Sequence, residues 1–143
     1  MIVVSIVGIL ALIAYPSYMS SVRQSRRQGA INALNTVQLA QERYRATNPT
    51  YGSLSSLIST YGVANLSGTT PDGNYTLTIT GPGGSGSPSA TGYVATATAI
   101  AGTSQVSDTA GGASCASLSV SQDQPVDSNP VQALSIQHAC WGR

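Results

Sequence analysis

The sequence predicts an α+β fold in which one long N-terminal helix packs against an antiparallel sheet of three or four strands. Three observations predict it. Apolar residues recur at helical spacing up to about residue 47, whereas three later segments alternate apolar and hydroxyl side chains. The two cysteines lie near the C-terminus. A chain of 143 residues suffices for one domain with a modest core.

The first fourteen residues are apolar apart from Ser5 and Gly8. A helix over residues 1–15 spans about 22 Å, which is less than the hydrocarbon core of about 30 Å. Pro16 lacks a backbone N–H, so we expect it to kink or loosen the preceding turn. The segment therefore predicts a helix that lies in lipid or in a helical bundle. It is about five or six residues too short to span a membrane.

The helical pattern resumes after Pro16 and continues to about Thr47. Asn48 precedes Pro49 and is expected to end the helix, because a residue before proline avoids the helical region. Arg23, Arg26 and Arg27 are expected to lie largely off the buried face. Residues at steps of three, four or seven predict that face: Tyr18, Val22, Gly29, Ala33, Val37, Ala40 and Tyr44, widened by Ile31, Leu34 and Leu39.

Residues 75–80, 93–100 and 115–122 each alternate apolar and polar side chains, which predicts three strands with one solvated face. The Gly- and Ser-rich stretch 81–92 predicts a flexible hairpin connection. Residues 131–141 predict a short fourth strand or a covering loop. The amphipathic half of the long helix is the natural cover for the apolar face of this sheet.

Charge is sparse and unevenly distributed. Only 8% of residues are charged, and all six basic residues are arginines. Residues 16–45 hold five arginines and one glutamate, a net charge of +4, whereas residues 46–142 hold four aspartates and no basic residue, a net charge of −4. Sparse charge with abundant Ser and Thr favours a secreted or surface protein over a cytosolic enzyme.

The chemically reactive residues form no catalytic pattern. Cys115 and Cys140 are either a disulfide or two unrelated buried thiols. A disulfide closing this loop would stabilise the fold by about 3 kcal/mol. His138 is the only histidine, and the carboxylates are scattered. We expect no enzymatic activity, no cofactor and no metal site.

Residues 1–34 resemble the N-terminal segment of bacterial type IV pilins of class a. The resemblance rests on the apolar run, Gly8, Pro16, the Tyr and Ser that follow, and the basic helix. Three further segments are similar to PilE-type and ComP-like pilins, which are often minor pilins. These segments are residues 75–80, residues 115–120 and the terminal Cys-Trp pair. The resemblance implies the pilin fold: a long kinked helix, a small antiparallel sheet and a C-terminal loop closed by a Cys115–Cys140 disulfide.

The resemblance implies a structural subunit of a type IV pilus. Residues 1–22 would form the membrane anchor and filament core, and residues 23–143 the head, which includes the amphipathic helix half to about residue 47. Gly8 and Pro16 would mark a stretch that can lose helical structure in the filament. From the charge distribution of this sequence itself, we expect Arg23, Arg26 and Arg27 to meet the acidic heads of neighbouring subunits. The residues expected to pack in the filament core are Ile2, Val3, Val4, Ile6, Val7, Ile9, Leu10, Leu12 and Ile13.

In pilins a methylated Phe begins the mature chain, and a nearby Glu pairs with a neighbour's amino terminus. Met1 falls inside that motif, so we expect a leader and about six mature residues before it, which would extend the span to about 30 Å. The precursor would lie in the inner membrane with its head in the periplasm. The mature protein would lie in the extracellular pilus, with other copies and the pilus assembly machinery as partners.

Two alternatives remain open. A minor pilin that acts as a DNA-uptake receptor is not favoured, because residues 46–142 hold no Arg or Lys and phosphate contacts would depend on a helix hidden in the filament. A pseudopilin of type II secretion would share the N-terminal segment but commonly uses calcium or other loops in place of a C-terminal disulfide. The ComP-like similarity favours a minor subunit, although we expect a subunit repeated along the filament.

Overall fold

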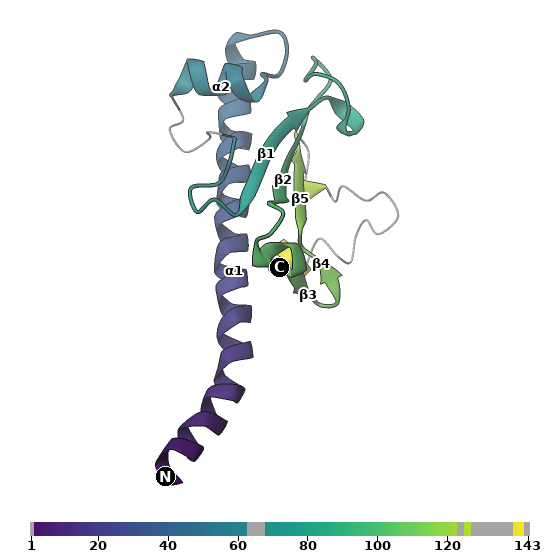
Figure 1. Cartoon of the computed structure of the whole chain (residues 1–143). Coiled ribbons are helices and arrows are strands. Elements are labelled where there is room, and N and C mark those ends of the chain that lie inside the picture. The colour runs from purple at the N-terminus through teal and green to yellow at the C-terminus, as the bar shows by residue number, and fades with distance from the viewer. Residues whose placement is uncertain (1, 63–67, 123–124, 127–138, 142–143) are drawn as a thin grey trace.

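The computed structural model describes residues 2–62, 68–122, 125–126 and 139–141. Two helices, a four-stranded antiparallel sheet and a small hairpin make up this part of the chain. The long helix α1 (Ile2–Thr47) runs along one face of the sheet, and its N-terminal part extends beyond the head (Figure 1). The predicted α+β fold is therefore confirmed.

Helix α1 contains 46 residues and is about 70 Å long. It continues through Gly8 and Pro16 without a break, and its N-terminal part bends away from the axis of the rest (Figure 1). A proline inside a helix causes such a bend because it removes one backbone hydrogen bond. The helix ends as predicted at Asn48, whose backbone N–H and side-chain amide both donate to the carbonyl oxygen of Tyr44 at 3.0 Å.

The sheet has the order β1-β2-β5-β6 with every pair antiparallel. The three predicted strands are confirmed as β1 (Tyr75–Thr80), β2 (Val94–Ala99) and β5 (Ser117–Ser121). The fourth strand, β6 (Pro125–Val126), precedes the segment 131–141 in which it was expected. Residues 139–141 form a helical turn, and residues 131–138 lie outside the described part of the chain.

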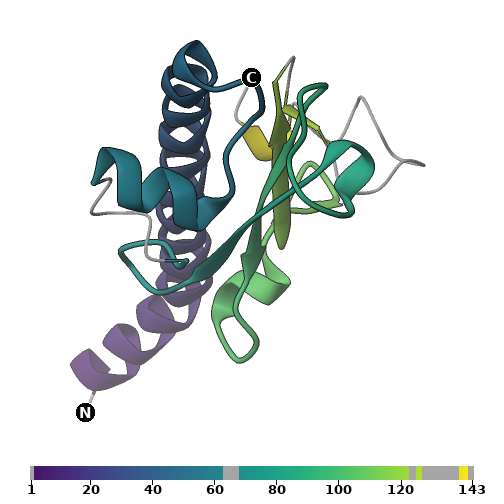
Figure 2. The same cartoon turned by 90° about the horizontal axis from the view of Figure 1, so that it is seen from above.

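The core lies between α1 and the sheet. In both views α1 follows one face of the sheet, and the short helix α2 (Leu54–Tyr61) lies alongside α1 (Figures 1 and 2). The predicted alternation places apolar residues of the strands on the buried face and threonines on the other. The buried apolar residues of the two layers are Ala30, Ile31, Ala33, Leu34, Val37 and Ala40 of the helix and Tyr75, Leu77, Ala95, Ala97, Leu118 and Val120 of the sheet.

The buried face of α1 differs from the prediction at several positions, and Ala30 and Gln41 are fully buried although they were not predicted to be. Tyr18 and Leu39 are 67% and 55% exposed, whereas Arg27 is 6% exposed. The buried positions of α1 run from Arg27 to Gln41 at helical spacing, so Tyr18 precedes the covered part of the helix. Leu39 lies between Val37 and Ala40 in the sequence, but its side chain is on the side of the helix that the head does not cover. Arg27 was expected off the face but occupies it, because an acidic partner in the head neutralises its charge.

Two small elements had not been predicted. In α2 the side chain of Ser53 accepts the N–H of Ser56 at 3.3 Å, and Gly62 ends the helix with φ +55°. The hairpin of β3 (Thr109–Ala110) and β4 (Ala113–Ser114) turns at two glycines with φ of +56° and +84°, a conformation that glycine adopts without strain.

A polar contact fixes the chain between the two helices. The side chain of Gln41, which is fully buried, donates to the carbonyl oxygen of Gly52 at 2.7 Å and accepts the Gly52 N–H at 2.9 Å. Both polar ends of this amide are therefore satisfied inside the core. The contact closes the C-terminal end of the buried face of α1.

Candidate functional site

The N-terminal part of α1 exposes several aliphatic side chains among its described residues. The exposed fractions of its described aliphatic residues range from 53% for Ile6 to 78% for Ile2. We call this set the apolar end of α1; it consists of Ile2, Val3, Val4, Ile6, Val7 and Leu10. The side chains of Ile9, Leu12, Ile13 and Pro16, which the sequence also singled out, lie outside the described part of the structure. A methyl group added at Gly8 would meet no atom within 4 Å.

Among the described residues, no helix combines the length and apolar character needed to cross a membrane.

The three arginines that follow the apolar end all contact the head of their own chain. They reach the 3-10 turn η2 (Ser104–Ser107) and the residue after it. Arg23 donates to the carbonyl oxygen of Ser107 at 3.1 Å, and Arg26 donates to the hydroxyl of Ser104 at 3.0 Å. Their predicted role between subunits stays a prediction, since the contacts of a single chain do not test it.

Arg27 forms a buried ion pair with Asp108 at the end of η2. Arg27 Nη1 lies 3.0 Å from Asp108 Oδ2, and the two side chains are 8% and 5% exposed. Burial of either charge alone would be costly, so each residue requires the other. The pair joins positions 81 apart in the sequence and closes the N-terminal end of the buried face.

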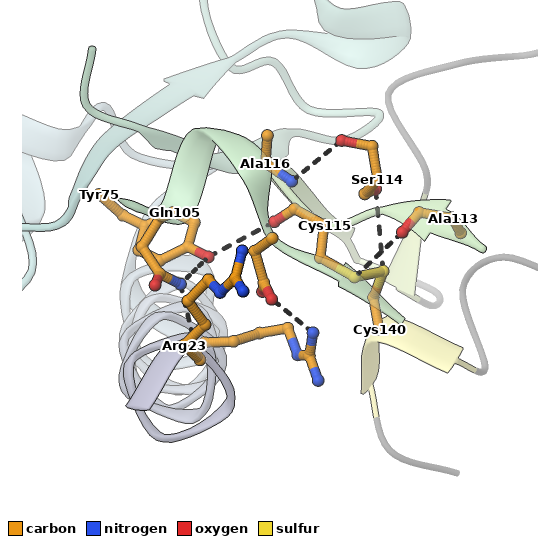
Figure 3. The surroundings of a disulfide bond; sticks show 10 residues. Arg23, Tyr75, Gln105, Ala113, Ser114, Cys115, Ala116 and Cys140 are labelled. Atoms are coloured by element: carbon orange, nitrogen blue, oxygen red, sulfur yellow. Dashed lines mark hydrogen bonds and ion pairs between the residues drawn. A yellow bond between two sulfur atoms is a disulfide. The ribbon is translucent and has the colours of Figure 1, made fainter. Parts of the chain in front are cut away.

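A hydrogen-bond network connects this junction to the disulfide (Figure 3). Gln105 lies between α1 and β1, and its amide donates to the carbonyl oxygen of Arg23 at 3.2 Å and to the hydroxyl of Tyr75 at 2.9 Å. The Tyr75 hydroxyl donates in turn to the carbonyl oxygen of Cys115 at 3.4 Å. Burial raises the pKa of Tyr75, and the hydrogen bond from Gln105 partly opposes that rise.

The disulfide between Cys115 and Cys140 is confirmed, with a Cα–Cα distance of 5.6 Å. Both cysteines are buried, and they tie the C-terminal helical turn to the segment after β4 (Figure 3). The backbone N–H of Cys115 also donates to the carbonyl oxygen of Asp108 at 2.9 Å. The disulfide therefore supports the loop that carries the partner of Arg27.

The opposite end of α1 carries two further arginines. Arg43 is exposed and makes no hydrogen bond or ion pair with the described residues. Arg45 donates to the carbonyl oxygen of Asn48 at 3.0 Å, and its guanidinium carbon lies 5.7 Å from the ring centre of Tyr51. The rings of Tyr51 and Tyr93 are 4.9 Å apart, so Arg45 lies over one ring of an aromatic pair; we call the turn with Glu42, Arg43 and Arg45 the cationic end of α1.

No group of three or more His, Cys, Asp or Glu residues comes together as a metal site within the part of the chain described by the structure. His138, the only histidine of the sequence, lies outside that part, as do Asp123, Asp127 and Arg143.

Comparison with known families identifies the type of protein. A sequence model described as "Type IV minor pilin ComP, DNA uptake sequence receptor" matches residues 16–119. The chain belongs to this family. The predicted resemblance to ComP-like type IV pilins is thereby confirmed. A search of the curated proteins found no match to the chain.

In this pilin the family match covers α1 from Pro16 onward, β1, β2, η2, the hairpin and the first part of β5. It begins after the apolar end and stops before Cys140. Sequence reasoning missed Gln105 and Asp108, which lie together in this matched region and connect the head to α1. Gln105 and Asp108 stand among small and hydroxyl residues, where no apolar periodicity marks them in the sequence. Only the fold brings them beside Arg23 and Arg27.

Proposed function

We propose that this pilin is a minor subunit that enters a type IV pilus by packing the apolar end of α1 against other subunits. Residues 1–22 carry no charge, and the described aliphatic side chains of the apolar end are more than half exposed in the isolated chain. Complete burial of each such side chain in a filament would contribute about 1.5–3 kcal/mol. This exposed surface is the observation that supports the proposal.

Before assembly, the same surface would lie in the lipid of the inner membrane with the head in the periplasm. The disulfide supports this placement of the head, because disulfides persist in oxidising compartments such as the periplasm. After assembly the protein would belong to the extracellular pilus. The pilus assembly machinery would carry out the transfer from lipid to filament.

Matched substitutions on α1 test this function. Ile6 and Leu39 are aliphatic residues with nearly equal exposure, 53% and 55%, but only Ile6 belongs to the apolar end. In cells that build the pilus, Ile6→Arg should remove the pilin from sheared filaments, because the arginine would be buried without a partner. Leu39→Arg should enter filaments at the wild-type level. Equal recovery of both variants would contradict the proposal.

DNA binding is a second candidate function, favoured by the description of the family. The cationic end of α1 offers a surface for it, because Arg43 is exposed and Arg45 lies over Tyr51 beside α2. These two arginines lie at the head end of the helix, far from the apolar end that the filament would bury. An arginine over an aromatic ring can contact a phosphate while the ring offers a stacking surface.

Salt dependence tests this candidate. If Arg43 and Arg45 each neutralise one phosphate, the logarithm of the binding constant should fall with the logarithm of salt concentration with a slope of about −2. The double variant Arg43→Gln/Arg45→Gln should weaken DNA binding and flatten that slope. Arg23→Gln/Arg26→Gln removes the same charge near η2 and serves as the control. An equal loss in both double variants would contradict a site at this end of α1.

A further inference from the structure

We propose that a recess between α1 and the head binds a phosphate group, supplied by a phospholipid headgroup or by free phosphate. The recess has a volume of about 180 Å³ and lies beside the junction of α1 with η2. Its lining is polar and comes from one face of α1 and from the chain after η2. The lining residues are Ser20, Arg23, Gln24, Arg27, Asp108 and Thr109.

Arg27 provides the first argument. Its Nη1 is bound to Asp108, but its buried Nε has no hydrogen-bond acceptor among the described residues. The Nε atom itself is closed to solvent, so a phosphate in the recess would meet Nη2 of this guanidinium, which takes no part in the bond to Asp108.

Arg23 provides the second argument. It lies one helical turn before Arg27 and lines the same recess. Its Nε and Nη1 donate to the carbonyl oxygens of Met19 and Ser107, at 3.4 and 3.1 Å, and these bonds hold the guanidinium in position. The remaining nitrogen, Nη2, takes part in neither bond. Two fixed arginines thus contribute to one recess.

The charges and small polar groups of the recess suit an anion. Two arginines and one aspartate give it a formal charge of +1. The Asp108 carboxylate is bound to Arg27, so it positions that guanidinium while opposing part of the attraction for a second anion. Thr109 contributes a hydroxyl group and Gln24 an amide, and each can donate to a phosphate oxygen, whereas the Ser20 hydroxyl donates to the carbonyl oxygen of Ser17 at 2.8 Å.

The position of the recess favours a lipid headgroup. Tyr15 and Tyr18, each 67% exposed, lie between the apolar end and the recess. Tyrosines of this kind gather at the membrane–water interface. Arg23 follows Tyr18 by about 7.5 Å along the helix. If the apolar end lies in lipid, as proposed above, the recess falls at the level of the phosphates; this step rests on the proposed function.

Thermal unfolding of the full chain in a non-ionic detergent tests the recess without a membrane. Inorganic phosphate, exchanged for chloride at equal ionic strength, should raise the Tm of the wild type. Arg23→Gln should abolish the shift. Arg27→Lys should also abolish it, because lysine can still pair with Asp108 but lacks the second terminal nitrogen of the guanidinium. Arg43→Gln, with the same loss of charge as Arg23→Gln, should keep the wild-type shift.

Vesicle binding tests the source of the phosphate. The full chain should bind vesicles of phosphatidylcholine and should bind more strongly when phosphatidylglycerol is included. Arg23→Gln should lower that gain by about fivefold, which corresponds to one arginine lost near an anionic surface. Arg43→Gln should leave the gain unchanged.

The outcomes separate the recess from the proposed function. A wild-type Tm indifferent to phosphate would overturn the site, and so would an equal loss in Arg43→Gln, which would indicate net charge alone. A phosphate shift without any vesicle binding would support the recess as a site for free phosphate and would contradict the lipid stage of the proposed function. If Arg23→Gln weakened DNA binding but left vesicle binding unchanged, that result would overturn a lipid headgroup as the source of the phosphate.

Discussion

At the scale of single residues, the Arg27–Asp108 pair fixes the position of α1 against the head. Both side chains are almost fully buried, and the two residues are 81 positions apart in the sequence. A buried pair of this kind adds little net stability relative to well-packed apolar residues, but loss of one partner leaves a buried charge uncompensated. The pair therefore acts mainly on the choice of register between helix and head.

Substitution of one partner should reveal this asymmetry. We expect Arg27→Met to lower the free energy of unfolding by about 3–5 kcal/mol, because Asp108 would remain charged and buried. The double variant Arg27→Met/Asp108→Leu should recover most of that loss. Urea unfolding of the three proteins measures both effects. Arg43→Met, at an exposed residue without a described partner, is the control and should change the stability by less than about 0.5 kcal/mol.

Two buried tyrosines make the stability sensitive to alkaline pH. Burial raises the pKa of Tyr93 and of Tyr75 above the ordinary value of 10.0. Above that pH the unfolded chain loses protons that the folded chain retains, so the unfolded state binds fewer protons and stability falls as pH rises. The contribution is complete below pH 10 and is lost from there upward.

Tyr93→Phe tests this effect at one residue. The Tyr93 hydroxyl has no hydrogen-bond partner among the described residues, so its removal should cost little at neutral pH. Above pH 10 the variant should lose stability less steeply, by up to about 1.4 kcal/mol per pH unit. Urea unfolding on either side of pH 10 measures the slope. A variant with the wild-type slope would contradict a proton retained on Tyr93.

At the scale of elements, periodicity predicted the parts of the fold that bury a continuous face. The strand at 75–80 and the end of the helix at Thr47 agree with the structure to the residue. Alternating residues in β1 and β2 expose threonines on one side only because α1 covers the other. These elements could be predicted because local sequence and global packing require the same pattern.

Elements held by caps and turns escaped that reasoning. Helix α2 is only eight residues long, and its signals are Ser53 at the start and Gly62 at the end. The Gly-Gly pair between β3 and β4 is likewise a turn signal. Arg27 was placed off the buried face because an apolar pattern treats every arginine as exposed. Its partner Asp108 is distant in the sequence, so only the fold brings the two together.

The middle strand β2 depends on small side chains. Ala97 is fully buried and pairs in register with Leu77 on one side and Leu118 on the other. Ala97→Leu should lower the free energy of unfolding by about 1–3 kcal/mol, because the added carbons have no space beneath α1. Thr98→Leu adds bulk to the neighbouring exposed position and should be tolerated. Urea unfolding of both variants measures the difference.

At the scale of the whole molecule, the basic helix and the acidic head that the sequence predicts already contact each other within one chain. Arg23, Arg26 and Arg27 bind the head of their own chain around η2. Contacts of the same arginines with neighbouring heads stay a prediction. If they contribute, purified filaments should depolymerise faster as sodium chloride is added, because salt screens exposed charge pairs. Depolymerisation that is indifferent to salt would contradict such pairing.

The two polar contacts at the ends of the buried face also determine how the molecule resists force. Arg27–Asp108 and Gln41–Gly52 are 14 helical positions apart, about 21 Å along the helix axis. Tension applied to the N-terminal end of α1 along its axis would act on both contacts in shear. Because both must yield before the helix can slide, the head would detach in a single rupture rather than by peeling turn by turn. In the proposed filament, a pull along α1 would therefore load these two contacts together in each subunit.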